Sequence, residues 1–131
     1  MGSRRYKDMN LYSCIVLNLL SSALGIDLSQ KGLEDKLDHI LRKAEEGLSK
    51  SEIMHHIRSN HNMVTRILSD LEEKGFVEVS SSESGYSVRP TRDGILHVRD
   101  FNRFYASIYS SQIEDHYRYL GLPAWYRKFN G

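Results

Sequence analysis

The segment from Leu48 to Gly94 constrains the fold of this chain most, because its residue order marks where several elements begin and end. Ser49 and Glu52 have the spacing of a capping box, in which the serine caps a helix and the glutamate reaches back to the serine N–H. Leu48 and Ile53 occupy the two apolar positions of a hydrophobic staple around that cap. We therefore expect a helix to begin directly after Ser49.

A second helix is predicted after a short polar interruption. Residues 59–62 read Ser-Asn-His-Asn, which are typical capping and turn residues. Apolar residues then recur at helical spacing, at Met63, Val64, Ile67, Leu68 and Leu71. Lys74 and Gly75 supply a basic last turn and a C′ glycine, so this helix is expected to end there.

Two strand-like segments follow, at residues 76–79 and 86–88. The polar residues 80–85 between them suit the tip of a hairpin. Thr91 is the expected N-cap of another helix. The predicted order is therefore helix, turn, helix, hairpin, helix.

This order and two short motifs resemble the winged helix-turn-helix regulators of the MarR and PadR type. In those proteins a leucine, two residues, lysine, glycine and a hydrophobic residue close the recognition helix, and a threonine, two residues and glycine follow the wing. Here residues 71–76 read Leu-Glu-Glu-Lys-Gly-Phe, and residues 91–94 read Thr-Arg-Asp-Gly. The layout is closer still to small archaeal winged-helix DNA-binding proteins, in which a long helix after the wing pairs with a partner chain.

The resemblance implies a mainly α fold with a small β-wing: a winged helix-turn-helix with extra N-terminal and long C-terminal helices. We expect an N-terminal arm and apolar helix at residues 1–30, and the winged helix-turn-helix DNA-binding domain at residues 31–94. A C-terminal dimerisation helix and an aromatic, basic tail would occupy residues 95–131. A chain of 131 residues fits one domain with such appended helices.

Charge is unevenly distributed, although the net charge is only +1. Residues 47–69 carry three Lys or Arg against Glu52, whereas residues 70–83 carry five Asp or Glu against Lys74. A basic recognition face beside an acidic helix end suits contact with phosphates on one side only. The alternative is that both are ordinary solvated faces.

The outer face of the second motif helix supplies the candidate base contacts. Arg66 can donate two hydrogen bonds to guanine, Asn62 can pair with adenine, and Thr65 offers a hydroxyl or a methyl group. Phosphate contacts are expected from the start of the motif and the wing base. The remaining candidate DNA-binding residues are Lys50, Asn60, His61, Ser69 and Arg89. The wing tip has no arginine and contains Glu83, so we expect the wing to position the protein rather than to read sequence.

Catalytic and metal-binding motifs are absent from the sequence. It has no glycine-rich phosphate loop, no nucleophile elbow and no paired cysteines. The adjacent His55 and His56 would point about 100° apart on a helix and make a poor pair of metal ligands. We expect no enzymatic activity, no metal and no cofactor. Cys14, the single cysteine, lies in an apolar run and is expected to be buried, which favours a reducing, cytoplasmic setting.

The apolar run from Leu11 to Leu24 follows a basic segment, as in a signal peptide. Asn18, Ser21 and Ser22 interrupt the run, which is too short to span a bilayer. We expect instead an amphipathic or mostly buried helix over residues 9–24, and no membrane association.

A long C-terminal helix is predicted from Arg92 to Leu120, because this stretch has no proline and its one glycine lies at the start. Such a helix would have about 28 residues and measure about 42 Å. Apolar residues recur along it at helical spacing, which gives the candidate dimerisation residues Ile95, Val98, Phe101, Phe104, Tyr105 and Ile108. A twofold partner copy would cover this stripe. Packing against the chain's own N-terminal helix is the alternative, and the role of the aromatic tail stays open.

Together these features predict a sequence-specific regulator of transcription that binds double-stranded DNA as a homodimer. An architectural, weakly specific chromatin protein is the alternative within DNA binding. A winged helix used for protein–protein assembly is the alternative outside it. The sequence does not identify a small-molecule effector.

Overall fold

The computed structural model describes residues 8–43, 47–82 and 85–130, and the described chain is mainly helical with one two-stranded antiparallel sheet. This agrees with the predicted mainly α fold with a small β element. The basic segment before Asp8 and the hairpin tip with Glu83 lie outside the described residues, so the expectations placed on them are not addressed.

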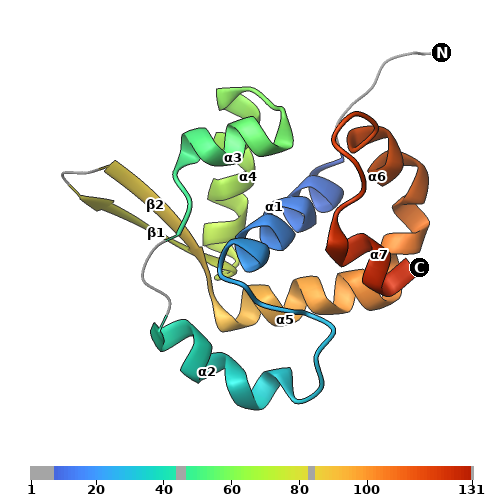
Figure 1. The fold of residues 1–131 in the computed structure, drawn as a ribbon. Helices are drawn as coiled ribbons and strands as arrows, with labels where there is room; N and C mark the ends of the chain where they lie inside the picture. The colour runs from blue at the N-terminus through green and yellow to red at the C-terminus, as the bar shows by residue number, and fades with distance from the viewer. Residues whose placement is uncertain (1–7, 44–46, 83–84, 131) are drawn as a thin grey trace.

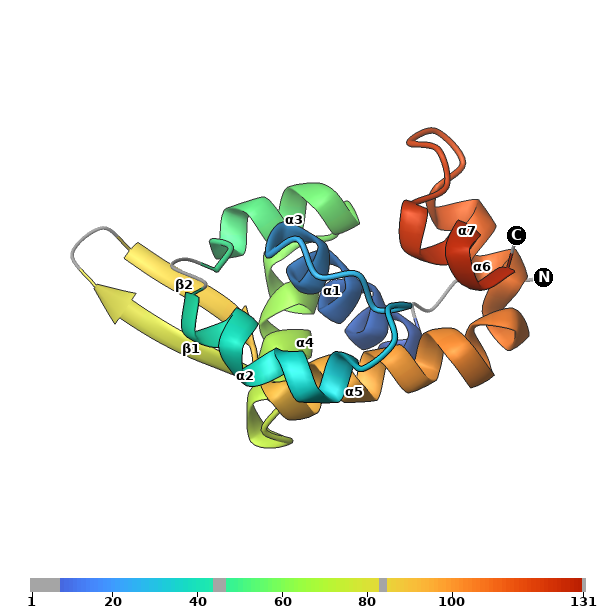
Figure 2. The same cartoon turned by 60° about the horizontal axis from the view of Figure 1, so that its bottom comes forward.

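Helix α1 (Met9–Ala23) runs through the middle of the molecule (Figures 1 and 2). It packs against α3 (Lys50–Ile57), α4 (His61–Glu73), β2 (Gly85–Pro90) and α5 (Arg92–Asp100). The Asp8 carboxylate caps it by accepting a hydrogen bond from the Leu11 N–H at 3.1 Å. Ten of the 15 residues of α1 are buried, including the polar Asn18 and Ser21, whereas the ends of the helix reach the surface. The predicted buried helix over residues 9–24 is therefore confirmed. No helix of the described chain is long and apolar enough to cross a membrane.

Helices α2 (Leu33–Lys43), α3 (Lys50–Ile57) and α4 (His61–Glu73) follow. Helix α3 begins directly after the predicted cap Ser49, and α4 begins within the predicted capping run 59–62. The Ser49 N–H donates to Glu52 at 2.9 Å, and the Glu52 N–H donates to the Ser49 hydroxyl at 3.1 Å, which completes the capping box. The Asn60 side chain caps α4 by accepting from the Met63 N–H at 2.8 Å. The α3 cap was readable in the sequence because it depends on two residues three apart, whereas the run 59–62 offered several candidates for the α4 cap.

Strands β1 (Val77–Ser82) and β2 (Gly85–Pro90) form an antiparallel hairpin that projects from the body at the end opposite α6 and α7 (Figures 1 and 2). The sequence did not predict that a third segment joins them. The Leu48 N–H donates to the Val88 carbonyl at 2.9 Å, and the Val88 N–H donates back at 2.8 Å. A Cβ atom on Gly47 would lie 1.9 Å from the Val88 carbonyl oxygen, so this close approach requires glycine.

The continuous α-helix predicted from Arg92 to Leu120 is wrong. The chain forms α5 (Arg92–Asp100), a π-helical turn η1 (Phe101–Tyr105), a 3₁₀ turn η2 (Ala106–Tyr109) and α6 (Ser110–His116). Residues 117–123 then reverse the chain before the short α7 (Ala124–Asn130).

A buried polar contact accompanies the first of these changes in pitch. Asn102, in the π-helical turn, exchanges two side-chain hydrogen bonds of 2.8 and 2.9 Å with Asn18 of α1. At the junction of the 3₁₀ turn and α6, the Ser110 hydroxyl donates to the Ser107 carbonyl at 2.6 Å and competes with regular helical bonding. The spacing of apolar residues correctly predicted that residues 92–116 are helical, but it does not distinguish an α-helix from a π-helical or 3₁₀ turn.

Candidate nucleic-acid interface

The two sides of helix α4 differ as its sequence predicts. Its apolar side is buried against the body of the molecule, at Val64, Ile67, Leu68 and Leu71. Its other side is exposed along most of its length, at His61, Asn62, Thr65, Arg66 and Ser69. The candidate base-reading residues Asn62, Thr65 and Arg66 therefore share one accessible face.

Two of the polar groups at the start of α4 already have hydrogen-bond partners. The Asn60 side-chain oxygen is used by the helix cap, which leaves its amide N–H groups as donors. The Thr65 hydroxyl donates to the His61 carbonyl at 2.8 Å, which directs the hydroxyl back along the helix. Asn60 thus holds the geometry of the helix start, and Thr65 keeps its methyl group and its acceptor capacity for a ligand.

Lys50, His61 and Tyr86 come together from three different elements. The Lys50 ammonium lies 3.5 Å from Nε2 of His61 and 5.8 Å from the centre of the Tyr86 ring. This arrangement joins the starts of α3 and α4 to strand β2 and holds the Lys50 charge at the start of α4. Tyr86 is a candidate site residue that the sequence analysis missed, since the only signal was an aromatic residue on a polar hairpin.

Positive charge on this face is not neutralised by neighbouring carboxylates. No ion pair among the described residues involves Lys50 or Arg66. Glu52, the one acidic residue between positions 47 and 69, is used in the capping box. Hydrogen bonds from the Ser49 backbone N–H and side chain hold the pKa of the Glu52 carboxyl below its ordinary value.

The far end of α4 has the opposite character. The Lys74 ammonium pairs with the Asp70 carboxylate at 2.9 Å, and Glu72 and Glu73 are exposed beside them. A phosphate would be repelled at this end and attracted at the other. The surface defined by Lys50, His61, Asn62, Thr65 and Arg66, which we call the α4 face, is therefore the candidate interface.

Arg89 is placed differently from the expectation of a phosphate contact at the wing base. One guanidinium nitrogen donates to the Leu41 carbonyl in the last turn of α2 at 2.8 Å, and Nε is buried without a partner among the described residues. A cation at a helix C-terminus is stabilised by the unpaired carbonyls there. This contact ties β2 to α2, and it argues against Arg89 as a phosphate ligand.

Comparison with known proteins identifies no relative. No family model, no curated protein and no solved structure matches this chain.

The predicted dimerisation stripe is divided between the interior and the surface. Ile95 and Val98 are 0% exposed and Phe101 is 6% exposed, so these three belong to the chain's own core. Phe104, Tyr105 and Ile108 are 62%, 55% and 71% exposed. The inner half of the stripe packs within the chain, where α5 lies against the N-terminal helix α1. This is the alternative to packing on a partner copy. Only the outer half, which we call the aromatic stripe, can meet a partner.

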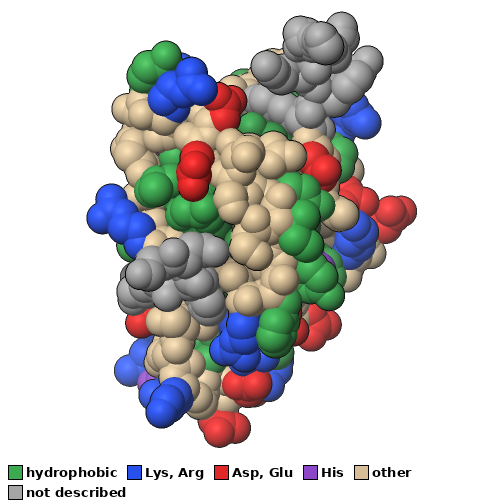
Figure 3. Space-filling model, turned by 90° about the vertical axis from the view of Figure 1, so that its right-hand side faces the viewer, with side chains coloured by type: hydrophobic (Ala, Val, Ile, Leu, Met, Phe, Trp, Pro, Cys, Tyr) green, Lys and Arg blue, Asp and Glu red, His purple; other side chains and the backbone are tan. Residues whose placement is uncertain are grey.

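Other apolar side chains reach the surface at the end of the molecule that carries α6 and α7 (Figure 3). Tyr119 is 80% exposed and Leu120 is 55% exposed in the turn before α7. The tail also packs inward, because Trp125 and Tyr126 are buried and the Tyr12 hydroxyl lies 3.0 Å from Nδ1 of His116. Part of the aromatic tail therefore completes the core around α1.

The neighbouring histidines of α3 do not form a metal site in the part of the chain that the structure describes. The rings of His55 and His56 are both exposed, with centres 6.0 Å apart and planes at 78°. No group of three His, Cys, Asp or Glu among the described residues could hold a metal ion.

Proposed function

We propose that this protein binds double-stranded DNA in a sequence-specific manner and regulates transcription as a homodimer. The observation that carries the proposal is the α4 face, where Asn62, Thr65 and Arg66 are exposed and the Lys50 ammonium lies 3.5 Å from Nε2 of His61. A helix that enters the major groove needs such an accessible face with donors, acceptors and unpaired positive charge.

The arrangement of elements around α4 supports a winged helix-turn-helix. Helix α2, the Leu48 bridge, α3, α4 and the β1–β2 hairpin follow one another in the order of that module. The hairpin corresponds to the wing, and it projects from the body where a second contact to DNA could form (Figure 1). The pairing of Leu48 with Val88 fixes the hairpin base to the start of α3, so the wing and α4 would meet DNA as one unit.

The residues of the α4 face suit distinct tasks in this proposal. Arg66 and Asn62 would contact base edges, since arginine pairs with guanine and asparagine with adenine in two-bonded arrangements. Lys50 and His61 would contact phosphates, which position a protein on the duplex without reading sequence. Tyr86 would hold the Lys50 ammonium between the hairpin and the helix start.

The homodimer is supported by the aromatic stripe. Phe104, Tyr105 and Ile108 are adjacent large apolar side chains that stay exposed in the single chain. A twofold pairing of this surface would bury them and place two α4 faces on one DNA molecule. Two half-sites about 34–36 Å apart would then share one binding event.

Binding-site selection from a random duplex library, followed by salt titration of the selected and random duplexes, tests the proposal. We expect the selected site to bind at least about a thousandfold more tightly than random duplex. Binding should weaken steeply with salt because phosphate contacts release counterions. Equal affinity for both duplexes would favour an architectural protein. Absence of salt-dependent retention on DNA would favour a protein–protein assembly module.

A further inference from the structure

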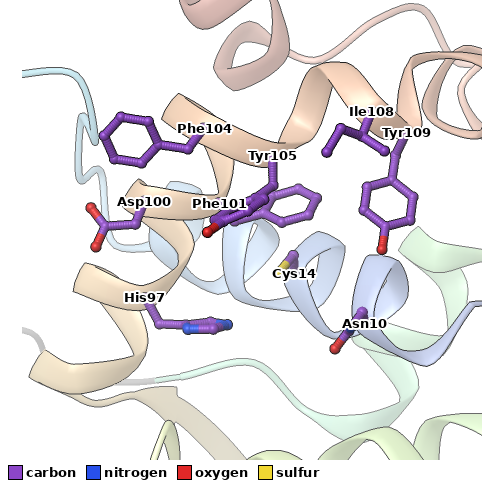
Figure 4. Close-up of a pocket in the computed structure, with 9 residues that line it drawn as sticks. All are labelled: Asn10, Cys14, His97, Asp100, Phe101, Phe104, Tyr105, Ile108 and Tyr109. Atoms are coloured by element: carbon purple, nitrogen blue, oxygen red, sulfur yellow. The ribbon is translucent and has the colours of Figure 1, made fainter.

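A groove with a volume of about 680 Å³ lies between α1 and the segment from α5 to η2 (Figure 4). This volume is within the range of small-molecule sites, which is about 300–1,000 Å³. Four aromatic rings line it, at Phe101, Phe104, Tyr105 and Tyr109. Figure 4 shows Asp100 and Phe104 on one side of the groove and Asn10 and Tyr109 on the other, with Cys14 of α1 between them.

The polar lining gives the groove a negative character. Among its described lining residues, Asp100 is the only one with a full charge at neutral pH. Burial raises the pKa of the Cys14 thiol to about 12, so this group stays a neutral thiol. Partial burial lowers the pKa of His97, whose ring stacks on Phe76 at 4.4 Å, so the imidazole is neutral as well.

The nearby cations interact mainly with carboxylates outside the groove. Arg99 lies 3.4 Å from the Asp100 carboxylate, but its shorter ion pair, at 2.9 Å, is with Glu34 of α2. The charge of Arg103 also acts on Glu34. Lys74, whose charge reaches Cys14 and His97, is paired with Asp70 at 2.9 Å. The Asp100 carboxylate is therefore only partly neutralised, because Arg99 is shared between two carboxylates.

We infer that this groove binds an organic cation: a molecule with one positive charge on nitrogen or phosphorus, surrounded by aromatic or alkyl groups. The faces of aromatic rings attract a cation within about 6 Å of the ring centre, and the attraction is strongest for ions that shed water easily. Asp100 would supply the opposite charge, and the apolar wall would cover the organic groups. An anion of the same shape would meet the carboxylate and the ring faces unfavourably.

The test uses two ions of matched shape and opposite charge, tetraphenylphosphonium and tetraphenylborate. Each is titrated into the full chain without DNA at a sub-micromolar protein concentration where light scattering shows monomers, since a partner copy would cover the aromatic stripe. Binding is followed by the change in fluorescence of the tyrosines that line the groove. We expect tetraphenylphosphonium to bind at least about tenfold more tightly than tetraphenylborate. Because DNA is absent, the result does not depend on the proposed DNA-binding function.

Substitutions then identify the groups responsible. Asp100→Asn should weaken tetraphenylphosphonium binding about three- to fivefold, as expected for a partly exposed charge pair. Asp93→Asn is the matched control, because Asp93 is exposed on the same helix and does not line the groove. Phe104→Leu keeps the apolar bulk but removes the ring face, and it should weaken the cation about two- to fivefold.

Three results would overturn the inference. Equal or tighter binding of tetraphenylborate would show that the groove selects bulk and not charge. An equal loss in Asp93→Asn and Asp100→Asn would show that only net charge matters. Absence of tetraphenylphosphonium binding by the wild-type chain would show that the groove holds no such ligand. Thermal melting of each variant checks folding, and the exposure of Asp100 and Phe104 makes their replacement mild.

Discussion

Arg66 illustrates how much of the proposed function depends on single side chains. It is exposed on the α4 face, and no described residue forms an ion pair with it. We predict that Arg66→Ala weakens binding to the selected duplex by about 1–3 kcal/mol and relaxes base preference at one position per half-site. Fluorescence anisotropy titration measures the loss. Arg118→Ala removes the same charge from the C-terminal region, where Arg118 pairs with Asp115, and serves as the control. Unchanged affinity in a folded Arg66→Ala protein would remove this residue from the interface.

Lys50 should act on phosphates and not on bases. Its ammonium lies between His61 and the Tyr86 ring, at the edge of the α4 face. We predict that Lys50→Ala weakens binding to all duplexes alike and flattens the slope of log affinity against log salt by about one unit. Lys50→Arg keeps the charge and should retain the slope. A loss confined to the selected duplex would instead assign Lys50 to base recognition.

Arg89 should affect folding more than DNA binding. Removing its guanidinium leaves the Leu41 carbonyl without this donor, and an unpaired, partly buried acceptor costs about 1–3 kcal/mol. We predict that Arg89→Ala lowers the free energy of unfolding in urea by that amount and leaves the salt slope of DNA binding unchanged. The opposite result, a flatter slope with full stability, would restore the phosphate contact that the sequence suggested.

At the scale of elements, the connection between α1 and the π-helical turn depends on the buried pair Asn18 and Asn102. Each side-chain amide forms its hydrogen bonds with the other, so replacing one residue leaves the buried amide of its partner without a hydrogen bond to it. We predict that Asn18→Leu and Asn102→Leu each lower the free energy of unfolding by about 1–3 kcal/mol. The double variant should lose less than the sum, because no polar group is then left unpaired. Urea denaturation of the four proteins measures this coupling, and strictly additive losses would show that the pair does not act as a unit.

The beginnings of helices were the part of the fold most readable from the sequence. The caps of α3 and α5 at Ser49 and Thr91 accept the hydrogen bonds that their positions predict, and the cap of α4, Asn60, lies within the predicted capping run 59–62. Caps are local, so a few neighbouring residues determine them. The Leu48–Val88 bridge joins residues that are distant in sequence, so it leaves no periodic signal. The change from α-helix to π-helix at Asn102 accompanies a contact with α1, which is also distant in sequence.

The candidate interface was predictable to a similar extent. The exposed side of α4 followed from the spacing of its apolar residues, which places Arg66 and Asn62 outward. The positions of Tyr86 and Arg89 were not predictable, since both depend on how the hairpin packs against α2 and α3.

At the scale of the whole molecule, the aromatic stripe should determine the oligomeric state. Ile95 and Val98 are already buried in the chain, so only the exposed residues of the stripe can be substituted to test dimerisation. We predict that replacing Phe104 and Ile108 together by serine gives monomers and removes most of the DNA affinity, because burial of each large side chain contributes about 1.5–3 kcal/mol. Light scattering measures the mass, and Tyr119→Ser, at an exposed aromatic residue outside the stripe, is the control. A wild-type protein that is monomeric at tens of micromolar would contradict this prediction.

The turn between α3 and α4 has a consequence for the evolution of the chain. Arg58 is the one described residue other than glycine with a positive φ, at 53°. A side chain in this left-handed conformation costs about 1–2 kcal/mol, which glycine would avoid. Glycine at position 58 would remove this backbone cost, but it would also remove the contact that the Arg58 side chain makes. If this turn before α4 contacts DNA, the arginine lowers the stability of the fold and contributes to binding. Laboratory evolution for heat resistance would then be expected to select glycine at position 58, and evolution for DNA binding to retain arginine.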